Sequence, residues 1–267
     1  IDSTPVQSLN VSNNPNLAIL NISETGIEEI DLSNNPNLIQ FYADHQSGSV
    51  NAGKKLKSLD IANNTYLQYL FASGNDFTSV DLSNNIYLTD VYLNNNLLTS
   101  INLDNNTYLQ NLMLRNNYFD FATLPLPNEQ WLNYDYMQRN MPLAKSQKVG
   151  TVIDLSSKVL SDGCVTTMAM YKVDEANPNG NVALGEEYYT YEDGKVTLLK
   201  ETTDSVYLAF ACDAFPLTDL ASQPLRTVKF IVKSEENFGI DDKAFTFSTP
   251  ISSNGASVSM SIGMVGA

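Results

Sequence analysis

The chain has 267 residues, of which 43% are apolar, and it carries a formal net charge of −15 at pH 7 with a pI near 4.3. This length and apolar content are enough to bury real cores, which excludes a disordered protein. The negative charge would repel phosphate backbones and anionic lipid surfaces, so nucleic acid is excluded as an expected partner.

The first half of the chain repeats a short pattern. Apolar residues two positions apart recur six times, an Asn follows three residues after each pair, and the pairs begin at steps of 11, 10, 11, 10 and 11 residues. The pairs are Leu59/Ile61, Leu70/Ala72, Val80/Leu82, Val91/Leu93, Ile101/Leu103 and Leu112/Leu114, with Asn64, Asn75, Asn85, Asn96, Asn106 and Asn117 behind them. A 21-residue unit cannot bury its own apolar side and must stack on its neighbours. The period and the L-x-L-x-x-N pattern therefore predict a mainly β leucine-rich-repeat solenoid with a parallel β-sheet.

Each part of the pattern has a physical role. Alternate side chains of an extended segment share a face, so Leu70 and Ala72 point inward and Phe71 points outward. The Asn amide can donate to and accept from backbone groups that the following bend leaves unpaired, and stacked copies form a ladder. We prefer this role to glycosylation, although Asn10, Asn21, Asn63 and Asn105 begin matches to the acceptor pattern.

The register extends toward the N-terminus with one irregularity. Leu20/Ile22 and Phe41/Ala43 continue one strand series, and Leu9/Val11 and Ile30/Leu32 continue the other. The step from Phe41 to Leu59 is 18 residues, which indicates an insertion near residues 44–55. The insertion holds His45, Gly48, Gly53, Lys54 and Lys55. Insertions in solenoids form loops on one face, and a tolerated surface bulge is preferred here to a ligand contact.

Composition marks the end of the repeats. Prolines in the segment 123–127 stop the ladder, and Trp131, Tyr134 and Tyr136 can cap the open end of the core. We predict two docked domains, a solenoid with its cap over 1–145 and a second domain over 146–267. The first holds 6 basic and 14 acidic residues, a net charge of −8, and the second 9 and 16, a net charge of −7.

The second part has the pattern of a β-sandwich. Turn signals separate short apolar runs, which favours an immunoglobulin-like arrangement. The expected strands are Val149–Leu155, Val165–Val173, Glu187–Tyr191, Lys195–Leu199, Ser205–Cys212 and Leu225–Lys233, with Lys243–Ser248 and Ala256–Met264 assigned to the same domain.

Cys164 and Cys212 are the two cysteines of the chain. If their strands are antiparallel neighbours, Met168 would face Leu208 and Met170 would face Val206. A disulfide would suit an exported protein, but two reduced thiols are slightly preferred because adjacent strands need not meet the geometric limits of the bond.

The amino-acid sequence of the half-units resembles that of a known family. The stretch 67–85, LQYLFASGNDFTSVDLSNN, is similar to the 21-residue repeats of internalin-type bacterial surface proteins, and the resemblance covers about residues 6–121. The resemblance implies an extracellular adhesion or recognition role. It also implies an immunoglobulin-like domain after the repeats, because residues 152–157 are similar to the start of the domain that often follows them in this family. This chain has Met170 where that domain's core Trp is expected. It also has Ala43, Ala72, Leu93 and Leu114 where some relatives place a cysteine ladder, so no thiol ladder carries over.

The candidate site is the outward face of the first strand series, which lines the concave face in this fold. Successive units present large side chains flanked by polar ones, a composition typical of interaction surfaces. The predicted ligand-binding residues are Tyr42, Tyr69, Phe71, Asp90, Tyr92, Asn111, Met113 and Arg115. Ordinary sheet propensity of aromatics, or coverage by another part of the chain, is the alternative explanation.

Catalytic patterns are missing from the sequence. One histidine, no Gly-rich phosphate loop and no H-E-x-x-H or paired C-x-x-C motif argue against an enzyme, a cofactor and a transition metal. Asp31, Asp60 and Asp81 occupy equivalent positions, with Asn102 next, and could bind Ca²⁺ weakly, but an outward structural role on the second strand series is preferred.

We therefore expect a secreted or bacterial cell-surface protein that captures an extracellular protein ligand. A glycan is the alternative ligand, and a spacer without its own ligand is the alternative from another class. No run approaches the 18 apolar residues of a membrane span, and residues 1–5 are not a signal peptide. An export signal, or a lipid anchor on the cell surface, would come from a segment that this sequence does not include.

Overall fold

The computed structural model describes residues 4, 6–45, 54–159, 166–173, 181–215 and 224–238. Its elements are short strands and one helical turn. In chain order they are β1 (Ile19–Asn21), β2 (Gln40–Tyr42), β3 (Tyr69–Phe71), β4 (Asp90–Tyr92), β5 (Asn111–Met113), β6 (Asn133–Asp135), β7 (Ser146–Lys148), β8 (Val152–Asp154), α1 (Ser156–Val159), β9 (Thr166–Lys172), β10 (Val182–Ala183), β11 (Tyr189–Glu192), β12 (Lys195–Leu198), β13 (Val206–Cys212), β14 (Leu225–Arg226) and β15 (Ile231–Lys233).

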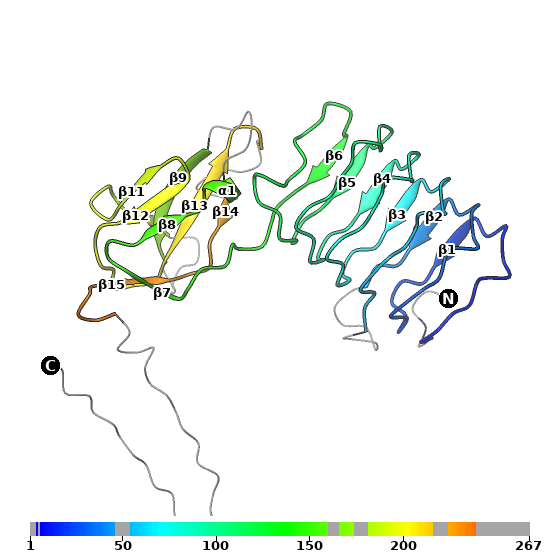
Figure 1. Cartoon of the computed structure of the whole chain (residues 1–267), viewed down its shortest axis with the longest axis horizontal. Helices are drawn as coiled ribbons and strands as arrows, with labels where there is room; N and C mark the ends of the chain where they lie inside the picture. Colours follow the sequence, from blue (N-terminus) through cyan, green and yellow to red (C-terminus); the bar gives the residue numbers. More distant parts are fainter. Residues whose placement is uncertain are drawn as a thin grey trace, which may run out of the picture.

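The first six strands form one parallel sheet in the order of the sequence (Figure 1). Each strand pairs in register with the next, so Leu70 lies between Phe41 and Val91, and the middle residues of β2 to β5 are fully buried. The first strand series of the sequence analysis is confirmed. Each unit adds one strand and one layer of apolar side chains to a continuous core.

The second series does not form strands in the described residues, so that expectation is wrong. Ile61, Val80 and Leu82 are buried as the pattern requires, but the backbone beside them turns instead of pairing. The Asp60 carboxylate accepts a hydrogen bond from the backbone N–H of Ala62 at 3.1 Å, which bends the chain two residues after the aspartate. Side-chain hydrogen bonds replace the strand ladder on this side of the solenoid.

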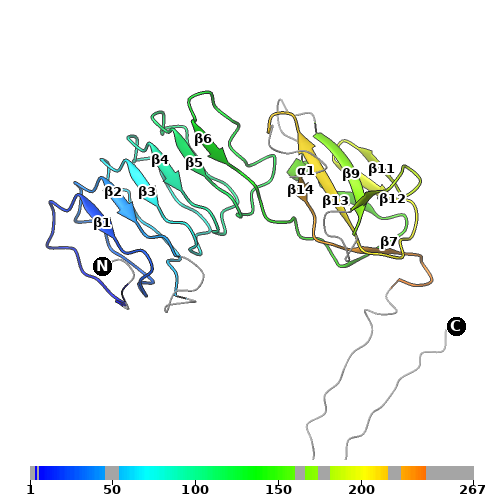
Figure 2. The same ribbon diagram turned by 180° about the vertical axis from the view of Figure 1, so that it is seen from behind.

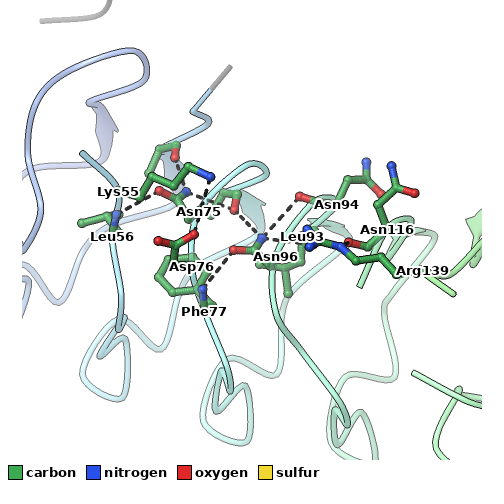
Figure 3. Close-up of polar contacts among 12 residues, drawn as sticks. Lys55, Leu56, Asn75, Asp76, Phe77, Leu93, Asn94, Asn96, Asn116 and Arg139 are labelled. Atoms are coloured by element: carbon green, nitrogen blue, oxygen red, sulfur yellow. Dashed lines mark hydrogen bonds and ion pairs between the residues drawn. The ribbon is translucent and has the colours of Figure 1, made fainter. Parts of the chain in front are cut away.

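A buried asparagine comes after each of β3, β4 and β5, and these amides form an inner ladder, of which Figure 3 shows Asn75 and Asn96. The Nδ2 group of Asn96 donates to the carbonyls of Ala72 and Leu93, both at 3.0 Å, and its Oδ1 accepts from the backbone N–H of Phe77 at 3.2 Å. Asn75 and Asn117 repeat this three-bond arrangement in the units before and after. Each side chain therefore connects its own unit to the preceding one.

An outer ladder on the second half-units uses the amide differently. Asn35, Asn64, Asn85 and Asn106 donate through Nδ2 to two carbonyls of the preceding unit, as Asn85 does to Ile61 and Asn64 at 3.0 and 2.9 Å. Their Oδ1 atoms are buried and have no hydrogen-bond partner in the described part of the chain. The inner ladder is satisfied on both sides of the amide, whereas the outer one is satisfied on the donor side.

Only glycine fits at position 74. Its φ is +79°, and Asn95 and Asn116 hold the same place in later units with φ of 57° and 58°. A Cβ on Gly74 would lie 1.8 Å from the backbone oxygen of His45. The left-handed conformation alone is compatible with Asn, so the close approach of the His45 backbone is what demands glycine.

The part of the chain that follows the solenoid lies beyond β6 (Figure 1 and Figure 2), and side chains of the two parts are in contact. Phe121 stacks on Phe215 with ring centroids 5.5 Å apart, and Tyr136 contacts the same ring at 5.3 Å. The Nζ atom of Lys158 lies 3.3 Å from the buried Asp120 carboxylate. Aromatic packing and a partly buried ion pair therefore join the two parts of the molecule.

The second part is built from three small sheets. β10-β9-β13-β14 and β11-β12-β8 are antiparallel, β15 pairs with β7 in parallel, and β13 is buried along its whole length. Tyr191 of β11 meets Phe210 of β13 edge-on at 6.1 Å, which brings the two antiparallel sheets face to face. Among the described residues, the expected strands lie near their predicted positions, except that Leu225–Lys233 is divided between β14 and β15. β7, β10 and α1 were not predicted from the sequence.

Two details of this part correct the sequence analysis. Met170 faces Leu208 and Met168 faces Phe210, so the predicted register of β9 on β13 is wrong by two residues. Cys212 is disulfide-bonded, which contradicts the preference for a reduced thiol. Cys164, most of the 44–55 insertion and the tail with its two expected strands lie outside the described residues.

Replacing Asn96 by Ala should destabilise the protein by about 3 kcal/mol, because it removes three buried hydrogen bonds worth about 1 kcal/mol each and leaves the Phe77 N–H without this acceptor. The carbonyls of Ala72 and Leu93 each keep a second donor, from Asn75 and Asn117. Urea unfolding followed by circular dichroism measures the change. Asn85→Ala should cost less, since the outer amide makes fewer bonds and its removal also takes away an unpartnered oxygen. Equal losses for the two variants would contradict this account of the inner ladder.

Gly74→Ala should cost at least about 2 kcal/mol, because the new Cβ collides with backbone rather than with a movable side chain. Asn95→Ala is the matched control. It changes the same position in the next unit, where a Cβ is already accommodated, and should cost about 1 kcal/mol or less. Thermal unfolding of both variants compares them directly, and a Gly74→Ala variant as stable as the control would contradict the close approach.

Candidate binding surface

The parallel sheet arranges its solvent-facing side chains in columns. Because β1 to β5 pair in register, residues at equivalent positions of successive units lie side by side. We call this solvent-facing side the concave face and define three columns on it. The central column is Asn21, Tyr42, Phe71, Tyr92, Met113 and Asp135; the upstream column is Ile19, Gln40, Tyr69, Asp90, Asn111 and Asn133; the downstream column is Ser23, Asp44, Ser73, Asn94 and Arg115.

Aromatic rings stack along the central column. The centroids of Tyr42 and Phe71 are 5.0 Å apart at an interplanar angle of 19°, and those of Phe71 and Tyr92 are 4.4 Å apart at 24°. All three side chains are half-buried because each covers part of its neighbour. Stacking fixes the rings in one orientation before any ligand arrives, which lowers the entropy lost on binding.

A chain of hydrogen bonds runs along the upstream column. Asn111 donates to Asp90 at 2.7 Å, and Asn133 donates to Asn111 at 2.7 Å. Thr89 also donates to the second carboxylate oxygen of Asp90 at 2.7 Å. Tyr42 extends the polar rim by donating its hydroxyl to Gln40 at 3.0 Å. The rim is therefore ordered by its own side chains.

The downstream column ties consecutive units together where the strands end. Asp44 accepts the backbone N–H of Ser73 at 2.7 Å, and Asn94 accepts that of Arg115 at 2.8 Å. Burial raises the pKa of the Asp44 carboxyl; hydrogen bonds from Ser73 oppose the shift and the negative charge of Glu24 adds to it. The ionised form of Asp44 is therefore held at a cost to the folded state.

The eight residues predicted to bind a ligand all lie on this face. Seven belong to β2, β3, β4 and β5, and Arg115 follows β5 by two residues. Arg115 donates from Nε to Asp135 of β6 at 2.7 Å, a partner that the sequence analysis did not identify. The structure brings the eight side chains together, and their role in binding stays a prediction.

A second aromatic row, not predicted from the sequence, lies beside the strands. Tyr66, Tyr87 and Tyr108 precede β3, β4 and β5 and are 56%, 43% and 59% exposed. Their rings lie 6.3 and 6.1 Å apart in sequence order. The signal was available, since each is the Tyr of the recurring phrase N-N-x-Y-L at a spacing of 21 residues. We call this set the tyrosine ridge.

The recurring aspartates have a structural role. Asp31 and Asp81 each accept the backbone N–H of the residue two positions later at 2.9 Å, and Asn102 does the same at 2.8 Å. Hydrogen bonds from the side chain and then from the backbone of Ser33 and Ser83 lower the pKa of Asp31 and Asp81. A neutral amide performs the same task at Asn102, so the position requires an acceptor atom and not a charge.

Comparison with solved structures identifies the architecture. The functional domain of InlJ from Listeria monocytogenes, which includes a cysteine ladder, superimposes with a TM-score of 0.56 at 22% identity, over 86% of this chain and 46% of that one. A leucine-rich-repeat protein of Leptospira interrogans matches at 20% identity over 43% of this chain and 36% of its own, with a TM-score of 0.30 that is too low to compare architectures. Our chain thus spans less than half the length of either protein.

Comparisons with protein-family models and with curated proteins find no match. No helix in the described part of the chain is long and apolar enough to cross a membrane. The shared architecture with InlJ and the six-stranded parallel sheet together define the fold. The chain is a mainly β leucine-rich-repeat protein.

Proposed function

We propose that this protein is a secreted or cell-surface recognition protein that binds a protein ligand on its concave face. The supporting observation is the stacked central column of Tyr42, Phe71 and Tyr92, rimmed by hydrogen-bonded polar side chains. Pre-ordered aromatics surrounded by a polar rim are the composition of energetically important interface centres. The proposal involves no catalytic step and no cofactor.

The comparison with InlJ also supports the location in this proposal. The resemblance of the repeats to internalin-type sequences, with their 21-residue period, and the architecture shared with InlJ support an extracellular or bacterial surface location. In this proposal the chain after residue 145 is an immunoglobulin-like spacer that carries the repeats away from the surface. A lipid anchor would be one means of attachment.

A glycan is the second candidate ligand. The chain of hydrogen bonds through Asp90, Asn111 and Asn133 presents oriented carboxylate and amide groups beside an aromatic column. Sugar hydroxyls pair with such groups, while their C–H faces pack on aromatic rings. The same surface would then serve a different ligand class.

The experiment screens the purified chain on paired protein and glycan arrays. The variant with Tyr42→Ala, Phe71→Ala and Tyr92→Ala should lose the wild-type signal by about a hundredfold in affinity, because aromatic interface centres dominate binding energy. The array that gives the signal identifies the ligand class.

The tyrosine ridge supplies a matched control. Replacing Tyr66, Tyr87 and Tyr108 by Ala removes the same number of aromatic rings at the same repeat spacing but leaves the concave face intact. Binding should survive in this variant. Loss of binding in the ridge variant alone would overturn the proposed site, and silence of the wild type on both arrays would favour a spacer.

A further inference from the structure

Two carboxylates on the concave face are not neutralised by any cation in the described part of the chain. Asp90 accepts hydrogen bonds from Thr89 and Asn111, and Asp44 accepts one from the Ser73 backbone. All of these donors are neutral, and no ion pair reaches either aspartate. Both carboxylates therefore leave their negative charge on the face.

The remaining charges of the three columns cancel. Arg115 is the one basic residue there, and its guanidinium is paired with Asp135 at 2.7 Å. The face therefore has a net negative charge that comes from Asp44 and Asp90. It lies on the part of the chain, residues 1–145, whose net charge is −8.

The two carboxylates flank the aromatic rings. Asp44 follows Tyr42 by two residues on one side of the central column, and Asp90 precedes Tyr92 by two residues on the other. The stacked rings of Tyr42, Phe71 and Tyr92 lie between them. Because the stacked rings cover each other's faces, a long cationic side chain would rest its apolar stem across the column and place its charged group beside one of the flanking carboxylates. This combination favours guanidinium and ammonium groups.

An ionised aspartate at position 44 also stabilises the folded protein less than an asparagine would. Asn94, two steps along the same column, makes the same hydrogen bond to the backbone N–H of the next unit without a charge. Because burial disfavours the ionised form of Asp44, the aspartate lowers the stability of the free protein at neutral pH. The hydrogen bond at position 44 therefore does not require the charge.

We propose that the concave face receives a cationic segment of its protein partner, with an arginine or lysine side chain over the aromatic column and its charge balanced by Asp44 and Asp90. This inference rests on the proposed function and specifies the chemistry of the partner. Charge complementarity of this kind speeds association and rejects acidic partners.

The chain itself provides conservative replacements for the test. Asn94 and Asn111 show that an amide fits in both columns, so Asp44→Asn with Asp90→Asn removes both charges. The new amide oxygens can keep the hydrogen bonds from the Ser73 N–H and from Asn111, and the Thr89 hydroxyl has to turn to accept from the amide NH₂ at position 90. The control is Asp31→Asn with Asp81→Asn. It changes the net charge equally away from the concave face, and Asn102 shows that its turns are retained.

Binding is measured by fluorescence anisotropy with short peptides in which Gly alternates with Arg, Lys or Glu. The Arg peptide should bind, the Glu peptide should not, and the Asp44/Asp90 variant should bind the Arg peptide about five- to tenfold more weakly, because two ion pairs are lost. The Asp31/Asp81 control should change affinity by less than about twofold, since only long-range attraction is altered and salt screens it.

Three outcomes overturn the inference. They are absence of binding of the Arg peptide, equal binding of the Glu peptide, and equal weakening by the two double variants. The affinity of the ligand identified on the arrays distinguishes failure of this inference from failure of the proposed function. If its affinity depends on Tyr42, Phe71 and Tyr92 but not on Asp44 and Asp90, the concave site stands and the cationic partner does not.

Stability gives an independent readout. Asp44 has a raised pKa in the folded state, so it disfavours folding once the pH exceeds its unfolded value and the carboxyl ionises. Asp44→Asn should therefore have a higher urea midpoint than the wild type at pH 7, and this advantage should vanish as the pH falls below the usual aspartate pKa of about 3.9. A lower midpoint at pH 7 would show that the aspartate is structural.

Discussion

The bridge from one side-chain amide to the backbones of two successive units is the interaction on which the rest of the structure depends. Asn96 holds the carbonyls of Ala72 and Leu93 at equal distances and so sets the separation of their units. Strands in a sheet lie about 4.8 Å apart, and the ring separations of 4.4 and 5.0 Å on the concave face follow that spacing. The stacked aromatics are therefore a surface consequence of a buried hydrogen-bond pattern.

The repeat made the sheet and its columns predictable, because residues at a fixed period must occupy equivalent places. The eight site residues could be placed on one face for the same reason. The backbone conformation of the half-units between the strands could not be predicted from the repeat. An apolar pair such as Val80 and Leu82 indicates which side chains are buried, but it is compatible both with a paired strand and with a turn. The decisive information lay in Asp81, whose side chain bonds to the backbone two residues later.

Contacts between distant segments were less accessible still. Gln138 continues the inner ladder by donating to the carbonyls of Leu114 and Tyr136, although it breaks the asparagine pattern. Its longer side chain reaches the Leu114 carbonyl, which is equivalent to the Leu93 carbonyl that Asn117 reaches one unit earlier. The extra length is needed because β6 is shifted by one residue in the sequence: Asn133 pairs with Asn111 at a spacing of 22 residues instead of 21. The register of β9 on β13 and the pairing of β7 with β15 likewise depend on packing that no local pattern records.

The packed junction between the solenoid and the following sheets has a mechanical consequence. Phe121, Phe215 and Tyr136 form a continuous aromatic contact, and the Asp120–Lys158 pair lies beside it. A pull applied to a ligand on the concave face would pass through this contact to β13, which is buried throughout its length. The two parts would then turn together as a rigid lever under tension, and the recognition face would keep a constant angle to whatever the other end is attached to.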